Sequence, residues 1–380
     1  MLNRGLELKA VFLLFFLCSA FASLCPAEDA VPIAGVGSVA VDAARPQSHS
    51  VAPGTPRNIA YFEAGPYWEF TLLHDEVTAA LARLDVLKHL RFPESLRVSP
   101  GWEADSSVYL AEARRLMTDP SVDLVISMGT VATKALLAEN NKKTPIVSID
   151  VADPVGAGII DAETGEGALN LTIQYTRDKW QKVFVLFHQA LPFNKLGIMY
   201  HDSPEGRSYS NVNEAREVAR DRGFTLIEYA GLDKEESSQS CAEGVRELIG
   251  QGVDSFYISA LNCFDWTQAN PQPIFDSLHS RGIWTFARDG SVHVRRGALM
   301  GLSTLDYTPL GNFYADRIAR LLRLVPDSLP LVQDQYSPKI TLNLDTAKDL
   351  KLDVPLVLLI TADEIFDSSL TPIRSETGAK

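Results

Sequence analysis

Two short apolar runs, residues 124–128 and 146–149, are each followed by residues that can bind a charged ligand. Gly129 and Thr130 follow the first run, and if a helix begins there, its free backbone N–H groups and the adjacent hydroxyl suit a carboxylate. Asp150 follows the second run and supplies an anionic partner for an ammonium group. The chemistry favoured by these positions is the binding of a small ligand such as an amino acid.

Each of these residues also has a purely structural interpretation. Gly129 and Thr130 could form an ordinary turn with a helix cap, but ligand contact is favoured because they follow a buried strand. For Asp150 both interpretations stay open. Asp153, which precedes Pro154, is interpreted as a turn residue that bonds its own backbone.

Aromatic residues at predicted loop and strand-end positions form a second group of candidates. Their rings can stack on a ligand ring or surround a cation, although packing between a loop and the core is the commoner role of an isolated Trp. Polar residues near them add possible ligand contacts. The candidates of these two kinds are Tyr67, Trp68, Tyr209, Asn262, Phe264 and Trp266.

The elements that must position these residues alternate along the chain from about residue 58 onward. Short apolar runs alternate with amphipathic stretches, which predicts parallel sheets covered by helices on both faces. A break near residues 165–167 divides them into two sheets. The predicted strands are 59–62, 124–128, 146–149, 196–200, 225–230, 256–259, 285–287, 298–305, 340–344 and 356–360. The predicted helices are 71–90, 105–117, 131–138, 179–189, 211–222, 240–249, 273–281, 310–324 and 345–350.

The N-terminal residues have the pattern of an export signal. Arg4 and Lys9 precede an apolar run too short to span a bilayer, and small residues suited to cleavage follow it. We predict a signal peptide at residues 1–27, with lipidation of Cys25 as the alternative. Residues 28–56 are rich in Ala, Pro, Gly, Ser and Val and show no periodicity, so they are predicted to form a flexible tether.

Composition limits the class of protein further. The chain has 380 residues, enough for two lobes, and its net charge of −13 argues against a nucleic-acid partner. The seven His residues have no metal-ligand spacing, and there is no nucleophile elbow or phosphate loop. No metal, cofactor or catalytic activity is therefore expected. Cys241 and Cys263 lie at predicted element ends in an oxidising compartment, which favours a disulfide over two buried thiols.

Five segments, in order along the chain, resemble motifs of the solute-binding proteins of ABC transporters. The resemblance is to the type I periplasmic-binding class, in the branch that includes aromatic amino-acid binders. The segments are Gly129-Thr-Val-Ala, Asp153-Pro-Val-Gly-Ala-Gly, Val292-x-x-x-x-Gly297-Ala-Leu, Leu305-Asp-Tyr-x-x-Leu-Gly311 and Ile340-Thr-Leu-Asn-Leu-Asp-Thr-Ala.

The resemblance, from about residue 58 to residue 352, implies an α/β fold with two doubly wound parallel-sheet lobes joined by a multi-crossover hinge. We predict an N-terminal lobe at 57–175 and 306–335, a C-terminal lobe at 176–305 and 336–367, and a tail at 368–380. The family also implies that Asp289, at the matching strand end of the second lobe, binds the ammonium of the ligand. Arg288 beside it could instead neutralise it.

The function implied by the resemblance is that of a periplasmic solute-binding protein serving an ABC permease. The expected ligand is an amino acid with an aromatic side chain, and a monomer is expected. Branched-chain amino acids, other small carboxylates and nucleobase-like rings remain open as ligands. The alternative function is a detached ligand-sensing subunit for a membrane receptor or sensor kinase, because the same fold serves both roles.

Overall fold

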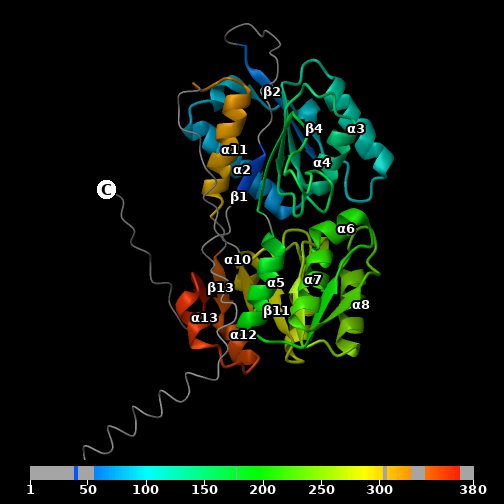
Figure 1. Ribbon diagram of the computed structural model, residues 1–380, viewed down its shortest axis with the longest axis vertical. Helices are drawn as coiled ribbons and strands as arrows, with labels where there is room; N and C mark the ends of the chain where they lie inside the picture. Colours follow the sequence, from blue (N-terminus) through cyan, green and yellow to red (C-terminus); the bar gives the residue numbers. More distant parts are fainter. Residues whose placement is uncertain (1–37, 42–54, 177, 303–305, 327–338, 369–380) are drawn as a thin grey trace, which may run out of the picture. The chain divides into compact units, whose positions relative to one another are not determined.

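Two seven-stranded sheets, each with helices packed against it, form the protein in the computed structural model (Figure 1). The structure describes residues 38–41, 55–176, 178–302, 306–326 and 339–368. We call the first sheet with its helices the N-terminal lobe and the second the C-terminal lobe. The predicted α/β fold with two parallel-sheet lobes is confirmed.

The sheet of the N-terminal lobe has the strand order β1-β7-β6-β5-β2-β3, and β4 also pairs with β2. All its pairings are parallel except that of β1 with β7. The strands are β1 Ser38–Val41, β2 Arg57–Glu63, β3 Leu90–Arg91, β4 Arg97–Val98, β5 Leu124–Met128, β6 Ile146–Ile149 and β7 Leu171–Thr176. The helices are α2 Trp68–Arg83, α3 Ser106–Thr118, α4 Gly129–Ala138 and α11 Thr308–Leu321, with 3-10 turns η1 Leu87–His89 and η2 Glu94–Leu96.

The sheet of the C-terminal lobe has the order β14-β13-β12-β11-β10-β8-β9, and only the β12–β13 pairing is antiparallel. The strands are β8 Lys195–Met199, β9 Thr225–Tyr229, β10 Ser255–Ile258, β11 Trp284–Ala287, β12 Met300–Leu302, β13 Ile340–Asn343 and β14 Glu364–Phe366. The helices are α5 Lys179–Ala190, α6 Pro204–Tyr209, α7 Val212–Arg222, α8 Ser238–Gly250, α9 Gln272–His279, α10 Ser291–Arg295, α12 Leu344–Asp349 and α13 Leu356–Thr361, with the 3-10 turn η3 Asn262–Phe264.

Strand β2 shows how one sheet serves two hydrophobic cores. Successive side chains of a strand point to opposite faces, so Ile59 and Tyr61 enter the core on one face. Ala60 and Phe62 enter the core on the other. Because both faces are covered, the strands are almost continuously apolar, and this is why their positions could be predicted.

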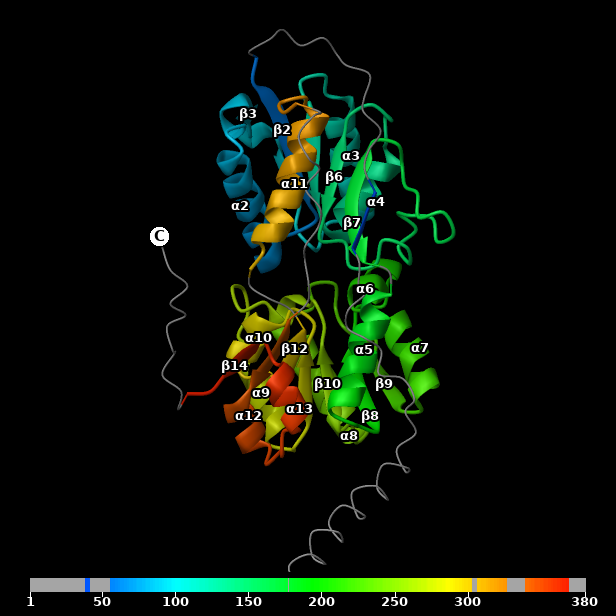
Figure 2. The same cartoon turned by 60° about the vertical axis from the view of Figure 1, so that its left-hand side comes forward.

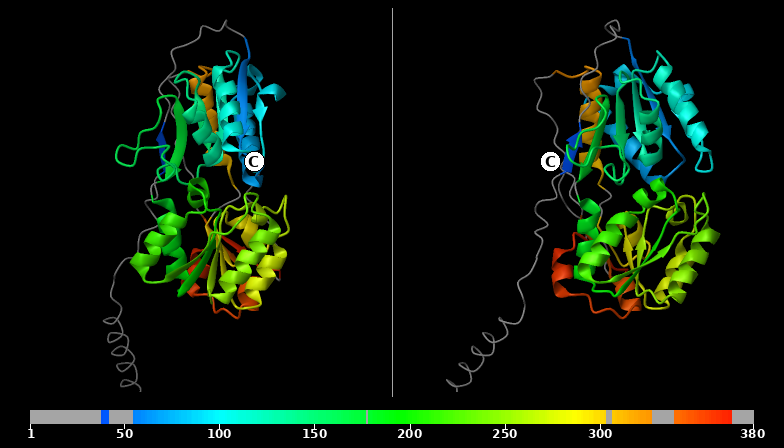
Figure 3. Two further views of the ribbon diagram at one scale, coloured as in Figure 1. Left: turned by 90° about the vertical axis from the view of Figure 1, so that its right-hand side faces the viewer. Right: turned by 45° about the vertical axis from the view of Figure 1, so that its right-hand side comes forward.

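Helix α11 belongs to the N-terminal lobe although it follows the C-terminal strands in the sequence. It packs beside α2 in the same core, as Figure 2 shows. In Figure 3 its orange ribbon again lies with the blue and cyan elements of the first sheet. The chain therefore returns to the first lobe late in the sequence, as expected for lobes joined by several crossovers.

Several predictions about secondary structure need correction. The short elements β3, β4, β14, α6 and α10 were not predicted, and the helix predicted at 71–90 ends at Arg83. Residues 356–360 were predicted as a strand but form α13; Pro355 precedes its first turn, and Leu356, Val357 and Ile360 are exposed rather than buried in a sheet. Strand β7 was not predicted. Strand β1 lies within the predicted tether 28–56, where it adds to the edge strand β7 through backbone hydrogen bonds that need no long apolar run.

The remaining predictions about the two ends of the chain concern residues outside those described. These are the signal peptide at 1–27 with its alternative lipid site Cys25, the rest of the tether up to residue 54, and the tail from 369. Within the described residues, no helix combines the length and apolar character needed to cross a bilayer.

Candidate functional site

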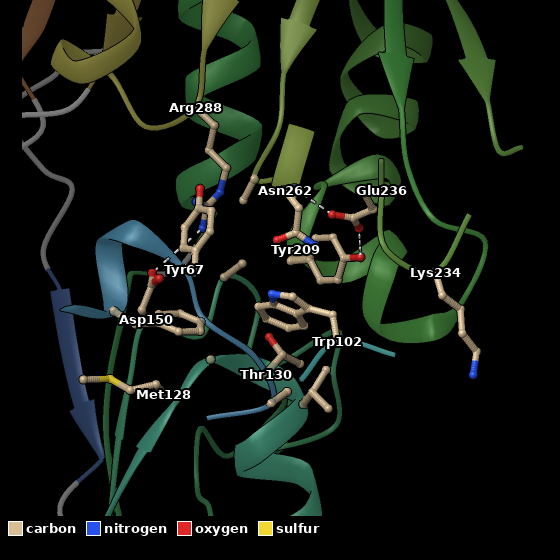
Figure 4. A pocket seen from close by; sticks show the side chains of 16 residues that line it. Tyr67, Trp102, Met128, Thr130, Asp150, Tyr209, Lys234, Glu236, Asn262 and Arg288 are labelled. Carbon is tan, nitrogen blue, oxygen red and sulfur yellow. Dashed lines mark hydrogen bonds and ion pairs between the residues drawn. The ribbon is translucent and has the colours of Figure 1, made fainter. Parts of the chain in front are cut away.

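The carboxyl ends of strands from both sheets surround one pocket (Figure 4). It contains about 620 Å³ of space not filled by atoms, including the opening to solvent. Its lining residues follow β2, β4, β5 and β6 in the N-terminal lobe and β8, β9, β10 and β11 in the C-terminal lobe. They are Ala64, Tyr67, Phe70, Trp102, Met128, Gly129, Thr130, Val131, Asp150, Ala152, Tyr209, Lys234, Glu236, Ala260, Asn262 and Arg288.

The start of helix α4 forms one part of the pocket wall. It begins at Gly129 directly after β5, and no side chain caps it. Its first-turn N–H groups have no partner within the helix and carry the positive end of its dipole. A Cβ added to Gly129 would lie 2.7 Å from the Phe70 ring, and its φ is +76°, so glycine is required there on two grounds. The uncapped helix start and Thr130 can therefore receive an anionic group of a ligand.

Three aromatic rings form an apolar wall in the N-terminal lobe. The Tyr67 and Phe70 rings meet edge to face with centroids 5.5 Å apart, and Phe70 and Trp102 are 6.4 Å apart. The Trp102 indole donates to the Pro66 carbonyl at 2.9 Å. It covers Gly65 so closely that a Cβ there would lie 2.7 Å from the ring. The rings are thus fixed before any ligand arrives and offer a flat surface for another ring.

A cluster of buried charges lies at one side of the pocket and joins the two lobes. Arg288, 7% exposed, donates to Asp289, and it also lies 3.8 Å from Glu69 and 4.0 Å from Asp150. The Tyr67 hydroxyl donates to Asp289 at 2.6 Å. Glu69 and Asp150 belong to the N-terminal lobe, whereas Arg288 and Asp289 follow β11 of the C-terminal lobe.

Burial shifts the protonation of this cluster. It raises the pKa of Asp150 to about 6 against the opposing effect of Arg288. Burial, with the neighbouring Asp150 and Asp289 carboxylates, also raises the pKa of Glu69 well above its ordinary value. Lys179, half-buried beside the cluster, has its pKa lowered by desolvation. Three carboxyl groups thus lie near two cationic side chains, and a third cation would favour the ionised forms of Glu69 and Asp150.

A second polar group lines the pocket from the C-terminal lobe. The Tyr209 hydroxyl donates to the Glu236 carboxylate, and the Asn262 backbone N–H donates to its other oxygen at 2.9 Å. Burial raises the pKa of Glu236 to about 7, although both hydrogen bonds oppose the shift. Cys241 and Cys263 form a disulfide, with an S–S distance of 2.06 Å, which ties the start of α8 to the η3 turn that carries Asn262.

Asp153 and Glu214 form a further contact between the lobes, beside a second cavity that Asp150 and Arg288 also line. Asp153 accepts a hydrogen bond from the Gly156 N–H at 2.9 Å, as expected for a turn residue. Burial, with Asp153 as hydrogen-bonded neighbour, raises the pKa of Glu214 to about 8. Glu214 in α7 is therefore largely protonated at neutral pH and can donate a hydrogen bond to Asp153.

Of the candidate ligand-binding residues, five line the pocket together: Tyr67, Gly129, Thr130, Asp150 and Asn262. Tyr209, considered as a further polar contact, lines it as well.

Four candidate residues are not part of the pocket lining, and one of them, Trp266, packs against Phe275. Phe264, 1% exposed, packs in the core against Phe256 and Phe275. Trp68 begins α2 and packs against the core of the N-terminal lobe. Asp289 accepts hydrogen bonds from Arg288 and Tyr67 and does not line the pocket. These contacts match the alternative in which Arg288 neutralises Asp289.

The pocket residues that were missed or given no ligand role include Phe70, Trp102, Glu236 and Arg288. Phe70 was placed before the predicted helix, but it lies in the first turn of α2. Trp102 follows the two-residue strand β4, which has no recognisable periodicity. Glu236 is in the loop after β9, and a carboxylate following a predicted strand was an available signal. Among the described residues, no group of three or more His, Cys, Asp or Glu side chains could hold a metal ion.

Fold and pocket together define a two-lobed solute-binding protein. Residues 101–366 match the family described as ABC transporter substrate binding protein, and the chain belongs to this family. No curated protein shows significant sequence similarity to it.

Solved structures with the same fold come from several bacteria. An ABC domain from Streptococcus pneumoniae in complex with L-Trp is 19% identical, with a TM-score of 0.63, and the match covers 82% of this chain and 100% of that one. A conserved domain protein from Vibrio cholerae gives 19% identity, a TM-score of 0.64 and the same coverage. A substrate-binding protein with adhesive properties from Clostridium difficile is 20% identical, with a TM-score of 0.51, and the match covers 82% of this chain and 99% of that one. At these identities the likeness concerns the fold alone.

Proposed function

We propose that this protein binds an amino acid with an aromatic side chain and delivers it to an ABC permease. The observation that carries the proposal is the aromatic wall of Tyr67, Phe70 and Trp102, which lines the same pocket as the uncapped start of α4 and the half-buried carboxylate of Asp150. The pocket therefore offers partners of opposite charge beside an aromatic surface, as an aromatic zwitterion requires.

The ligand would be oriented by these groups. Its carboxylate would accept hydrogen bonds from the first turn of α4 and from Thr130, where the helix dipole favours negative charge. Its ammonium would lie beside Asp150 and supply the third cation to the buried cluster. Its ring would stack against Trp102, where apolar burial and aromatic contact both contribute.

The proposed setting is the periplasm, reached through the export signal at residues 1–27. We propose that the protein acts as a monomer, that a ligand bridging the two lobes favours their closed arrangement, and that a permease recognises this arrangement.

Isothermal titration calorimetry of the mature protein, refolded to remove any copurified ligand, tests this proposal. L-Trp, L-Tyr and L-Phe should bind more tightly than L-Leu. Tryptamine lacks the carboxylate and indole-3-propionate lacks the ammonium, so each should bind at least tenfold more weakly than L-Trp. If no amino acid binds, or if either of these two analogues binds as well as L-Trp, the proposal is wrong.

Trp102→Ala tests the aromatic wall directly. We expect a loss of affinity for L-Trp of tenfold or more, because the ligand loses its main stacking surface. The matched control is Trp266→Ala, since Trp266 is similarly half-buried but lies outside the pocket, against Phe275 and Arg296. Equal affinities of the two variants would contradict this placement of the ligand ring.

A further inference from the structure

Glu236 is a buried carboxylate in the wall of the ligand pocket, and the site as proposed so far assigns it no ligand contact. It is 4% exposed. Within the part of the chain that the structure describes, no ion pair to it is found. The neighbouring Lys234 instead pairs with Asp105 at 3.4 Å across the lobes, where both side chains are largely exposed. A buried carboxylate without a cation is stabilised mainly by hydrogen-bond donors.

The donors that Glu236 has in the protein leave part of its capacity unused. One oxygen accepts from the Tyr209 hydroxyl and the other from the Asn262 N–H. Each carboxylate oxygen can accept two hydrogen bonds, so both retain a free acceptor position. A ligand that reaches this wall can therefore donate to Glu236 without displacing either protein donor.

The carboxylate is also held rigidly. Glu236 has a left-handed backbone with a φ of +55°, and the Asn262 side chain donates to the Glu235 carbonyl at 3.0 Å. The Cys241–Cys263 disulfide joins the two segments that carry these residues. A fixed acceptor of this kind discriminates strongly against a ligand that lacks the matching donor.

Its position relative to the rest of the pocket indicates which part of the ligand it meets. In Figure 4, Glu236, Tyr209 and Asn262 gather on one side of the pocket, whereas Arg288, Tyr67 and Asp150 lie on the other, with Trp102 and Thr130 between them. If the ammonium lies at Asp150 and the ring stacks on Trp102, the far edge of the ring faces Glu236.

We propose that Glu236 is a specificity-determining residue that accepts a hydrogen bond from the ligand ring, so that the site selects tryptophan or tyrosine over phenylalanine. This inference rests on the proposed binding of an aromatic amino acid. An indole N–H or a phenol O–H is the kind of neutral donor that suits a carboxylate in an otherwise aromatic pocket. Phenylalanine would leave the free acceptor positions buried without a partner.

Calorimetry with matched ligands tests the inference on the unmodified protein. 3-Benzothienyl-L-alanine has the shape of tryptophan but carries sulfur in place of the indole N–H. We expect L-Trp to bind about 10- to 100-fold more tightly than this analogue and L-Tyr similarly more tightly than L-Phe, as a hydrogen bond to a charged group implies. Equal affinities within both pairs would overturn the inference while leaving the proposed function intact. Binding of none of them would defeat the proposed function instead.

The variant Glu236→Gln should reduce the preference for L-Trp over the benzothienyl analogue to less than threefold while L-Phe still binds. Glu235→Gln is the matched control, because Glu235 is exposed and uses only its backbone carbonyl near the site, and it should keep the wild-type preference. If L-Lys binds wild type more tightly than L-Trp, Glu236 recognises a ligand cation and the inference is wrong.

The pH dependence gives a readout that a merely structural role would not produce. The groups facing Glu236 are Tyr209, Asp233 and the Asn262 N–H, and the pKa of Tyr209 is raised well above 10 by burial, so it stays neutral. Because the pKa of Glu236 is about 7, the preference for L-Trp should shrink as the pH falls from 8 to 6. Glu236→Gln should show no such change; an unchanged preference in wild type would count against the inference.

Discussion

Removing the Tyr67 hydroxyl should weaken ligand binding because it removes a hydrogen bond between the two lobes. The ring surface that Tyr67 presents to the pocket stays the same. The hydroxyl donates to Asp289 at 2.6 Å across the lobes, and both side chains are buried. Burial and the neighbouring Asp289 raise the pKa of Tyr67 well above 10, so it remains a neutral donor at physiological pH. Tyr67→Phe keeps the ring that lines the pocket and deletes only this hydrogen bond.

The expected magnitude follows from the partners of the bond. A hydrogen bond to a charged group contributes about 1.5–3 kcal/mol, and Asp289 keeps its bond to Arg288 in the variant. If the lobes separate when the ligand leaves, this contribution exists only in the closed arrangement. The dissociation constant for the ligand should therefore rise about 10- to 100-fold, whereas the ligand-free protein should keep nearly its full melting temperature.

Tyr307→Phe is the matched control for this experiment. Tyr307 donates to Glu69 at 2.8 Å, and both side chains are buried. Both also belong to the N-terminal lobe, so the same substitution removes a bond that closure does not create. Calorimetry and thermal unfolding of both variants should show an affinity loss mainly in Tyr67→Phe and a stability loss mainly in Tyr307→Phe. Equal effects of the two on affinity would refute the reasoning.

Two further predictions concern the C-terminal lobe. Replacing Cys241 and Cys263 by alanine should destabilise this lobe by about 3 kcal/mol, because their separation of 22 residues sets the loop entropy that the disulfide removes from the unfolded chain; an unchanged urea midpoint would contradict this. Burial and Asp153 raise the pKa of Glu214 from 4.5 to about 8, so closure takes up a proton and ligand affinity should fall as the pH rises through that window. Calorimetry across this pH range should show no fall in ligand affinity for Glu214→Gln. The control Glu217→Gln, which changes a neighbouring residue on the same helix, should show the same fall as the wild type. A fall in both variants would exclude the Glu214–Asp153 contact as the cause.

The strand ends were the part of the site that could be predicted from the sequence. A strand buried on both faces is a short, continuous apolar run, so the boundaries of β5 and β6 were found without error, and Gly129 and Asp150 with them. Polar residues that follow such runs necessarily gather at one edge of a parallel sheet. This geometric rule placed them in the pocket without knowledge of any side-chain contact.

Residues whose role depends on a partner distant in sequence could not be predicted in this way. Asp289 does follow a strand, yet Arg288 and Tyr67 hold its carboxylate, and the pairing with Tyr67 spans 222 residues. Trp102 reaches the pocket because its ring covers Gly65, a contact without periodicity in the sequence. Short helices pose a related problem, since six residues of α13 contain too few turns to show a helical pattern.

Strand β1 has a consequence for how the protein is produced. It pairs antiparallel with β7 from Ser38 opposite Thr176 to Val41 opposite Ile173. Without these four residues, β7 would present a free row of backbone donors and acceptors at the margin of the sheet, the arrangement that recruits strands from other molecules. A shortened recombinant chain that begins at residue 55 would keep every residue of the pocket and yet be prone to self-association, so an expression boundary should be chosen upstream of β1.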